Sequence, residues 1–282
     1  MSPTCTIQGV DVFVEGEGAH TLVMVHGWPD DHRLWDSTVQ ALKARYRCVR
    51  FTLPGFDLTK PPRAVAVAEM TGLIHAIADF GSPDAPVTLL LHDWGCMFGY
   101  EFAAVHPTRV AAVVAVDIGD HNSRDYLQAL GTKAGMAIFA YQCWLALAWK
   151  VGSRLSPALA NRMTRWMAHF IGCRTAPERI GWQMNYPYAM AWFGTNGGFK
   201  NIAKVKPAWP LLYIFGARKP FMFHSTQWLD EVAQRPGSEV HPFATGHWVM
   251  VQKPVEFNAC ILAWLAAEST TTAAADHQIG IC

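Results

Sequence analysis

The chain has 282 residues, of which 51% are hydrophobic, 12% aromatic and only 16% charged, whereas an average globular domain has about 25% charged residues. This composition excludes a disordered or highly solvated protein. The 23 lysines and arginines nearly balance the 22 acidic residues, for a formal net charge of +1, so neither nucleic acid nor an anionic membrane surface is expected as a partner.

The N-terminus has no basic segment followed by an apolar stretch, so we predict no secretory signal and a cytoplasmic location. The seven cysteines are scattered, without a CxxC pair or a ligand spacing. This pattern predicts reduced thiols, with neither a disulfide framework nor a metal site. The longest uncharged apolar run, residues 134–149, is shorter than the roughly 20 residues of a membrane span, so no transmembrane segment is expected.

Apolar, β-rich runs alternate with helical patterns in the first 120 residues. Each run ends at a loop signal such as HGWP, LPGF or HDWG, which is typical of buried parallel strands. We predict helices over residues 35–45 and 65–80. Strands are predicted at residues 21–26, 48–53, 87–92 and 109–116. Alternation of strands and helices predicts an α/β fold with a mostly parallel sheet that is covered on both faces.

The pattern changes after residue 120 to helical segments that are rich in Trp, Met, Tyr and Ala. Strand signals return at residues 210–215 and 238–242, and a last helix is predicted over 255–266. We therefore predict a core formed by residues 1–120 and 201–268, a helical cap at 121–200 and a loose tail at 269–282. Such a cap covers the carboxyl ends of the strands, where parallel sheets bind ligands.

The segment LLLHDWGCMFGYEFA is the most informative part of the chain. A strand pattern leads directly into Asp93 and then into a helix, which is the form of a nucleophile elbow with aspartate at the nucleophile position. Gly95 is small, as a sharp turn requires, but Leu91 stands where a small residue is usual, which suggests a relaxed elbow. A serine esterase is excluded because residue 93 is not serine.

Four motifs occur in order: HGWP at 26–29, LPGF at 53–56, HDWG at 92–95 and GHW at 246–248. Together they resemble the α/β-hydrolase superfamily, and within it the epoxide hydrolase and haloalkane dehalogenase branch, over residues 8–266. The resemblance implies an α/β-hydrolase fold, with a mostly parallel central sheet, flanking helices and an inserted helical cap.

The resemblance also implies a chemistry. Asp93 attacks an sp3 carbon and forms an alkyl ester, and His247 activates the water that hydrolyses this ester. The backbone N–H groups of Trp28 and Trp94 would form the oxyanion hole. Trp28 favours an epoxide hydrolase, because haloalkane dehalogenases typically have asparagine at this position to hold the leaving halide.

An epoxide oxygen needs an acid, which epoxide hydrolases supply with cap tyrosines. Tyr141 with Gln142 resembles the Tyr-Gln pair of their first cap helix, and either Tyr186 or Tyr188 matches the second tyrosine. The residues expected to line the substrate pocket are His26, Pro29, Gln142 and Trp248.

The acid that orients His247 is the main departure from the family pattern. The loop 217–220, where epoxide hydrolases usually carry it, has no carboxylate. Many dehalogenases take this acid from the end of the strand that follows the nucleophile helix, where this chain has Asp117 and, three residues later, Asp120. We predict that Asp117 orients His247, with Asp120 or no carboxylate as the alternatives.

The predicted function is hydrolysis of an epoxide to a vicinal diol, without cofactor or metal. The predicted partners are a small lipophilic epoxide and water, and homodimer formation is left open. The alternatives are a haloalkane dehalogenase that uses the same aspartate and a catalytically impaired hydrolase fold that binds a ligand or protein. Many tryptophans fall in the predicted cap, which suggests an apolar pocket beneath it and an aromatic surface at a subunit or membrane contact.

Overall fold

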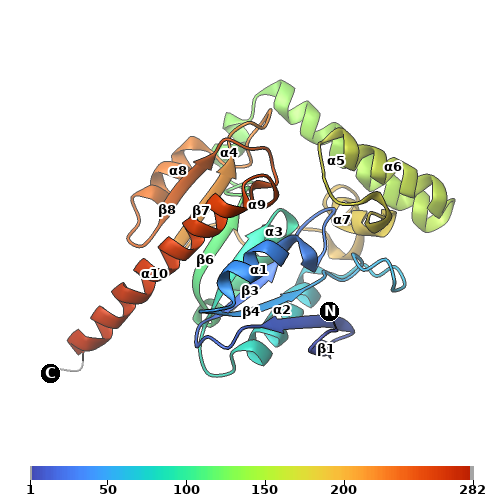
Figure 1. The fold of residues 1–282 in the computed structure, drawn as a ribbon. Helices are drawn as coiled ribbons and strands as arrows, with labels where there is room; N and C mark the ends of the chain where they lie inside the picture. The colour runs from blue at the N-terminus through green and yellow to red at the C-terminus, as the bar shows by residue number, and fades with distance from the viewer. Residues whose placement is uncertain (1, 280–282) are drawn as a thin grey trace.

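The computed structural model describes residues 2–279, which form an eight-stranded sheet with the order β1-β2-β4-β3-β5-β6-β7-β8 (Figure 1). From β4 to β8 neighbouring strands are parallel, so the predicted mostly parallel α/β-hydrolase sheet is confirmed. The antiparallel pair β1 and β2 at one edge was not predicted. The strands are β1 Cys5–Ile7, β2 Val10–Glu15, β3 Thr21–Val25, β4 Arg47–Phe51, β5 Val87–His92, β6 Val110–Val116, β7 Leu211–Gly216 and β8 Glu239–Phe243.

Alternation along the buried strands builds a core on each face of the sheet. In β5, Leu89 and Leu91 pack with residues of α2, α3 and α8, whereas Leu90 packs with residues of α1, α9 and α10, because successive side chains of a strand point to opposite faces. The helices that flank the sheet are α1 Asp36–Leu42, α2 Val67–Gly81, α3 Trp94–Val105, α8 Thr226–Ala233, α9 Val249–Gln252 and α10 Pro254–Ile279.

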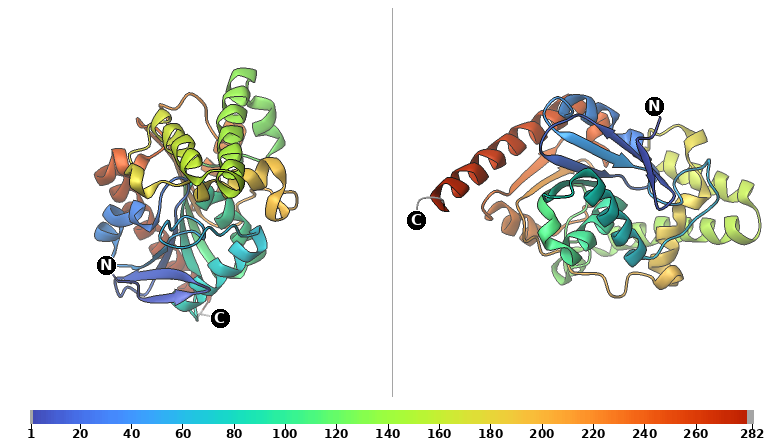
Figure 2. Two further views of the ribbon diagram at one scale, coloured as in Figure 1. Left: turned by 90° about the vertical axis from the view of Figure 1, so that its right-hand side faces the viewer. Right: turned by 90° about the horizontal axis from the view of Figure 1, so that it is seen from below.

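Helices are inserted between β6 and β7, within residues 121–200, and we call this segment the helical insertion. Its two long helices, α5 and α6, pack against each other on the outer side of the molecule (Figure 2). The helices of the insertion are α4 Arg124–Ala129, α5 Thr132–Arg154, α6 Pro157–Phe170 and α7 Tyr186–Phe193. Short 3₁₀ helices lie at His32–Trp35, Pro107–Arg109, Pro177–Arg179, Trp182–Asn185 and Thr195–Gly197.

The C-terminal helix is longer than the sequence pattern predicts. Helix α10 continues to Ile279, beyond the helix predicted over 255–266; the loose tail from residue 269 stays a prediction, and residues 280–282 lie outside the described part. No glycine or proline interrupts the chain between Pro254 and Gly280, and alanine, which favours helix, recurs there. Among the described residues, α5 is a helix long and apolar enough to cross a membrane by length and composition alone.

The turn between β5 and α3 is strained and tightly packed. Asp93 has φ +53° and ψ −121°, a conformation that is uncommon outside glycine. A Cβ at Gly95 would lie 2.2 Å from the Val25 carbonyl oxygen, and one at Gly99 would lie 2.4 Å from Leu91 Cδ2. Gly99 therefore makes room for the Leu91 side chain. The elbow is not relaxed, contrary to the expectation from Leu91.

Packing at the elbow gives a testable difference between two helical glycines. We expect Gly95→Ala to lower the free energy of unfolding by about 1–3 kcal/mol, because its methyl group overlaps a strand carbonyl that has little freedom to move. Gly72→Ala in α2 is the matched control, since nothing lies within 4 Å of its Cβ position, and it should be neutral or stabilising. Urea unfolding followed by tryptophan fluorescence measures both; equal effects would contradict this packing argument.

Candidate active site

The carboxyl ends of neighbouring parallel strands bring the predicted site residues together. Asp93 follows β5, Asp117 follows β6, Trp28 lies beyond β3, and His247 lies between β8 and α9. Because these strand ends share one edge of the sheet, residues from distant parts of the sequence meet there. The edge of the sheet, more than any single motif, therefore determines the site.

Asp93 presents its two carboxylate oxygens to different partners. Oδ1 accepts a hydrogen bond from the Trp28 backbone N–H at 2.7 Å, and Oδ2 lies 3.5 Å from His247 Nε2. Burial favours a raised pKa for Asp93, but the hydrogen bond and positive charge of His247 outweigh it and hold the pKa below its ordinary value. Asp93 is thus an anion at neutral pH, with one oxygen held and the other facing the histidine.

Asp117 is the carboxylate that reaches His247. His247 Nδ1 hydrogen-bonds to Asp117 Oδ2, and Asp117 Oδ1 accepts the Gly216 N–H at 2.9 Å. Burial disfavours the imidazolium, but the charges of Asp117 and Asp93 outweigh it and raise the pKa of His247 to about 9. Asp120 instead accepts hydrogen bonds from the Ser225 N–H and hydroxyl, each at 2.7 Å, so the structure does not place it against the histidine.

A lysine completes this charged group, and sequence reasoning missed it. The ammonium of Lys219 lies 2.5 Å from Asp117 Oδ2, the same oxygen that His247 contacts, and its side chain is only 7% exposed. Burial acts to raise the pKa of Asp117, but the positive charges of Lys219 and His247 hold it well below its usual range. The loop 217–220 therefore supplies a cation at the place where the family pattern led us to look for a carboxylate.

Gly27 allows two backbone donors to approach the nucleophile. A Cβ at this position would lie 2.3 Å from Asp93 Oδ1 and 2.6 Å from the Trp94 backbone nitrogen. The N–H groups of Trp28 and Trp94 are therefore close to the same carboxylate. The Trp28 indole Nε1 donates to Asn185 Oδ1 at 2.8 Å, so this side chain is fixed by the helical insertion.

Two cavities lie between the helical insertion and the sheet, with volumes of about 580 and 440 Å³. Asp93, Tyr141, Tyr188 and Phe223 line both of them. Asp93 thus lies where the two cavities approach each other, under walls that are largely aromatic. A pocket of this kind binds an apolar ligand and orients it with few polar groups.

Of the two alternatives in α7, Tyr188 faces the site and Tyr186 does not. The Tyr188 ring packs edge-on against Trp94, with 5.1 Å between ring centroids, and burial together with the Asp93 charge raises its pKa well above the ordinary value. Tyr186 is fully buried between Phe56 and Trp149, and its hydroxyl has no hydrogen-bond partner among the described residues. The structure therefore does not bring Tyr186 to the cavities that Asp93 lines.

Tyr141 is held by its neighbour in the sequence. Gln142 Nε2 donates to the Tyr141 hydroxyl at 3.1 Å, and Gln142 Oε1 accepts from Trp192 Nε1 at 3.0 Å. Burial raises the pKa of Tyr141 above its usual value, and the negative charge of Asp93 adds to the effect. Both Tyr141 and Tyr188 therefore keep their protons at neutral pH and can donate them into the cavities.

Two of the four residues expected to line the substrate pocket line a cavity at Asp93, and two do not. Gln142 and Trp248 each line one of the cavities, whereas His26 and Pro29 line neither, so the expectation for the last two is wrong. His26 is buried because it links two loops: its Nε2 accepts from the Leu53 N–H at 2.9 Å, which leaves Nδ1 to donate to the Gly27 carbonyl. Burial lowers the pKa of His26 to about 4.

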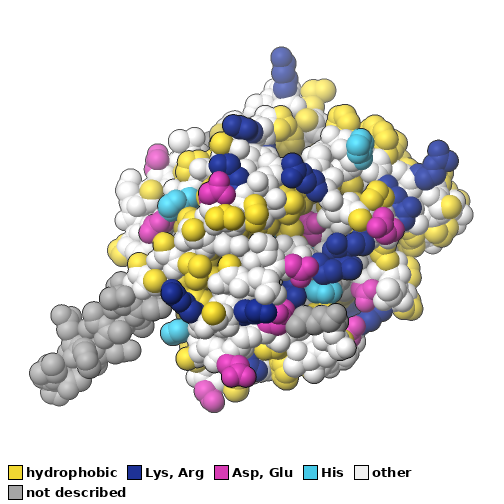
Figure 3. All heavy atoms as spheres, viewed as in Figure 1, with side chains coloured by type: hydrophobic (Ala, Val, Ile, Leu, Met, Phe, Trp, Pro, Cys, Tyr) yellow, Lys and Arg dark blue, Asp and Glu magenta, His cyan; other side chains and the backbone are white. Residues whose placement is uncertain are grey.

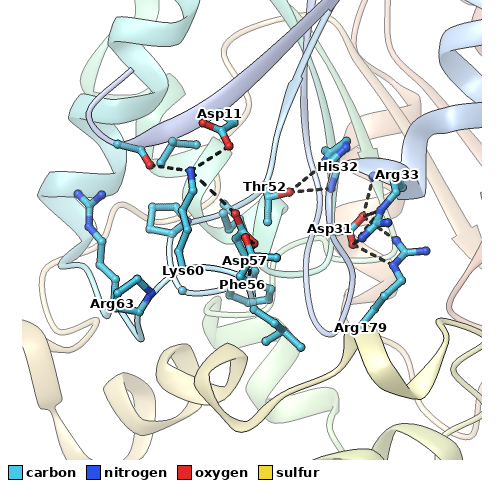
Figure 4. Close-up of a pocket in the computed structure, with 18 of the residues that line it drawn as sticks. Asp11, Asp31, His32, Arg33, Thr52, Phe56, Asp57, Lys60, Arg63 and Arg179 are labelled. Carbon is cyan, nitrogen blue, oxygen red and sulfur yellow. Dashed lines mark hydrogen bonds and ion pairs between the residues drawn. The ribbon is translucent and has the colours of Figure 1, made fainter. Parts of the chain in front are cut away.

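A smaller cavity of about 230 Å³ lies apart from Asp93 and is lined by charged residues (Figure 4). These charges pair with one another: Asp31 with Arg33 and Arg179, and Lys60 with Asp11 at 3.0 Å. Arg179 belongs to the helical insertion, so its 2.6 Å contact with Asp31 ties the insertion to the core. The described residues include no group of three or more potential metal ligands.

The fold and this arrangement of residues define an α/β hydrolase. The chain belongs to the family described as alpha/beta hydrolase fold, which matches residues 20–254, and the superfamily inferred from the motifs is thereby confirmed.

This chain is similar in structure to known epoxide hydrolases. The structure of an epoxide hydrolase from Bacillus megaterium has a TM-score of 0.68 at 20% identity and covers 93% of this chain and 99% of that chain. An epoxide hydrolase from Vigna radiata has a TM-score of 0.68 at 17% identity, covering 95% and 98%. At these identities the likeness shows the fold alone.

Curated relatives match shorter segments. A probable oxidoreductase, EphD, of Mycobacterium tuberculosis is 38% identical over 100 residues, which is 33% of this chain and 17% of that protein. Epoxide hydrolase B of the same organism is 31% identical over 102 residues, or 34% of this chain and 28% of that protein. The matched segments thus span less than a third of the length of either relative.

Lys219 gives a prediction about the titration of His247. We expect the imidazole of the Lys219→Met variant to bind its proton about tenfold more tightly, because a cation that competes for the same Asp117 oxygen is gone. The pKa of His247 therefore rises further, which NMR of the imidazole measures as a function of pH. Arg218→Met removes an exposed cation from the neighbouring position and should change this pKa little; an unchanged or lowered pKa in Lys219→Met would contradict the assignment.

Proposed function

We propose that this α/β hydrolase opens an epoxide to a vicinal diol through an aspartyl alkyl-ester intermediate, without a cofactor. The observation that carries the proposal is the position of two tyrosines, Tyr141 and Tyr188, in the cavities that Asp93 also lines. A carboxylate nucleophile needs an acid opposite it only when the leaving group is a poor one, such as the alkoxide of an opened epoxide. The helical insertion would then act as the cap that carries this acid.

In the first step, Asp93 Oδ2 attacks a ring carbon of the epoxide, since Oδ1 is held by the Trp28 N–H. The carbon–oxygen bond of the ring breaks as the new ester bond forms. The departing oxygen takes a proton from Tyr141 or Tyr188. The products of this step are a hydroxyalkyl ester on Asp93 and a tyrosinate.

In the second step, His247 Nε2 accepts a proton from water, and the hydroxide attacks the ester carbonyl carbon. The negative charge develops on Oδ1, which faces the backbone N–H groups of Trp28 and Trp94. Collapse of this intermediate releases the diol, whose oxygen takes the proton of the new carboxyl group, and leaves the Asp93 carboxylate beside the His247 imidazolium, as before the reaction. Asp117 stabilises the imidazolium in the meantime.

The charge of Asp93 also controls when His247 can act as a base. Before attack, the carboxylates of Asp93 and Asp117 hold the pKa of His247 at about 9, so the histidine is protonated at neutral pH. Esterification cancels the charge of Asp93, which lowers the proton affinity of His247. The His247 proton then passes to the tyrosinate, which restores the tyrosine and leaves a neutral histidine that acts as the base for hydrolysis of the ester.

A haloalkane dehalogenase is the second candidate, because Asp117 stands where many of these enzymes carry their acid and contacts His247. Two features count against it. The indole N–H of Trp28 is engaged by Asn185 and does not offer itself to a halide, and a halide leaves without the proton that two tyrosines provide. Halide release from a bromoalkane, measured beside diol formation, separates the two functions.

A catalytically impaired binding protein has lost its main support. That alternative relied on the absence of an acid from the loop 217–220, but Asp117 contacts His247 directly. Several relatives of this chain are epoxide hydrolases by name, which also favours the proposal. A lipophilic substrate suits the aromatic cavities. The cytoplasmic location of the protein stays a prediction.

The covalent intermediate is the sharpest test of the mechanism. Asp93→Asn should abolish turnover of a styrene oxide, at least about 1,000-fold, because an amide is a poor nucleophile. His247→Gln should still form the ester but hydrolyse it slowly, so mass spectrometry should find the substrate mass added to the peptide that contains Asp93. Turnover by Asp93→Asn at the wild-type rate would exclude the mechanism.

The two tyrosines of α7 provide a matched pair. We expect Tyr188→Phe to reduce kcat for epoxide opening about 100-fold, because one acid that faces the nucleophile is lost. Tyr186→Phe removes a hydroxyl that lies outside both cavities and should leave kcat within about twofold. Steady-state kinetics on the same epoxide measures both variants; a larger loss in Tyr186→Phe would reverse the assignment.

A further inference from the structure

The outer side of helices α5 and α6 exposes a row of large apolar side chains. On α5 these recur at helical spacing, with Met136 and Leu147 exposed by 67% and 49%, and on α6 Leu159 and Trp166 are exposed by 50% and 53%. The opposite side of α5 is packed into the protein. We call the exposed side the apolar face; it consists of Met136, Phe139, Trp144, Leu147, Leu159, Trp166 and Phe170.

Aromatic contacts join the two helices into one continuous surface. The rings of Trp144 and Trp166 lie 5.3 Å apart, and Phe170 stacks on Trp166 at 5.4 Å. Trp192 of α7 extends the surface, with its ring 4.9 Å from that of Phe139. Contiguous exposed patches of this kind are uncommon on monomeric proteins and mark interaction sites.

The charged residues of the segment that carries the apolar face are all basic. Residues 126–177 contain no aspartate or glutamate, although the chain as a whole is nearly neutral. In the same segment there are six basic residues, Lys133, Lys150, Arg154, Arg162, Arg165 and Arg174. The net charge of +1 argues against an anionic partner only as an average over the chain. Figure 3 shows yellow and dark blue side chains together over the region of α5 and α6.

We propose that the apolar face rests on an anionic phospholipid membrane, with α5 and α6 in the plane of the lipid head groups. Large apolar side chains enter the boundary of the acyl chains, and the basic side chains around them contact lipid phosphates. Tryptophans are favoured at this depth because one end of the indole is apolar and the other is polar.

Helix α5 lies on the membrane in this proposal and does not cross it. Its inner side packs closely: Leu145, Ala146 and Ala148 are buried, and a Cβ at Gly152 would lie 2.2 Å from the Trp182 ring. Crossing a bilayer would require the helix to give up these contacts. Its apolar composition is therefore explained by two surfaces, one packed on the protein and one on lipid.

A second copy of the chain fits the apolar face less well. A two-fold contact would place this segment against itself, and because it contains no acidic residue, its basic side chains would face like charges. An anionic lipid surface supplies the complementary charge and needs no matching shape.

The apolar face continues to the mouths of the cavities. Phe170 belongs to the face and lines the smaller of the two cavities at Asp93, and Phe139 belongs to the face and lines the larger. A lipophilic molecule dissolved in the membrane could therefore enter without passing through water. This step concerns access to the cavities and holds whichever bond the enzyme hydrolyses.

Vesicle binding tests the proposal without reference to activity. In a flotation assay, we expect the protein to bind vesicles of phosphatidylcholine that contain about one third phosphatidylglycerol, and to bind pure phosphatidylcholine much more weakly. The combined variant Leu147→Ser, Leu159→Ser and Trp166→Ser should bind at least about tenfold more weakly. Lys133→Gln and Arg162→Gln should each weaken binding about fivefold.

Matched controls use exposed residues elsewhere on the chain. Val105→Ser and Val255→Ser remove apolar side chains exposed by 55% and 77%, and Arg45→Gln and Arg235→Gln remove exposed charges; none should change binding. Thermal unfolding shows whether each variant is folded. If the serine variant is not folded, Lys133→Gln and Arg162→Gln give a second test. Failure of the wild-type protein to bind anionic vesicles, or equal binding to neutral ones, would overturn the proposal. A dimer in sedimentation that the serine variant dissociates, without vesicle binding, would assign the face to a second copy instead.

Discussion

The site depends on an imidazolium held between two carboxylates, of which Asp117 is buried and Asp93 partly buried. Neither Asp93 nor Asp117 would stay ionised alone in such surroundings, because burial disfavours an isolated charge; each is stabilised by His247. With Lys219 on the second carboxylate, the group contains two anions and two cations and is neutral overall. Loss of the charge on Asp93 breaks this balance, and expulsion of the His247 proton is the simplest way to restore it.

This balance explains why the loop 217–220 carries a lysine. Asp117 alone would bind the imidazolium so strongly that His247 would be a poor base even after Asp93 had been esterified. Lys219 competes for the same oxygen and weakens that attraction, while the Gly216 N–H fixes the other oxygen. A departure from the family pattern at one loop is thus matched by a departure at the end of β6, and the two residues are in contact.

Residues that follow strand ends could be predicted from the sequence, and residues whose position depends on packing could not. Asp93 and Asp117 each follow an apolar run, and parallel strands bring their carboxyl ends to one edge. The choice between Tyr186 and Tyr188 depends on the start of α7 and on how it rotates against Phe56 and Trp94, which Pro187 obscures in the sequence. His26 belongs to the most recognisable motif, yet a backbone N–H from a loop 27 residues away fixes it outside the cavities.

The sequence is rich in aromatic residues, and those of the helical insertion lie on two different surfaces. Inward-facing Tyr141 and Tyr188 provide polar hydroxyls inside an apolar cavity, whereas Trp144 and Trp166 are exposed by 36% and 53%. Composition records only the sum of these two uses, and net charge likewise averages a basic insertion, whose residues 126–177 include no acidic residue, with a more acidic core. The aromatic surplus of this chain therefore reflects one segment with two apolar sides, more than an unusually large core.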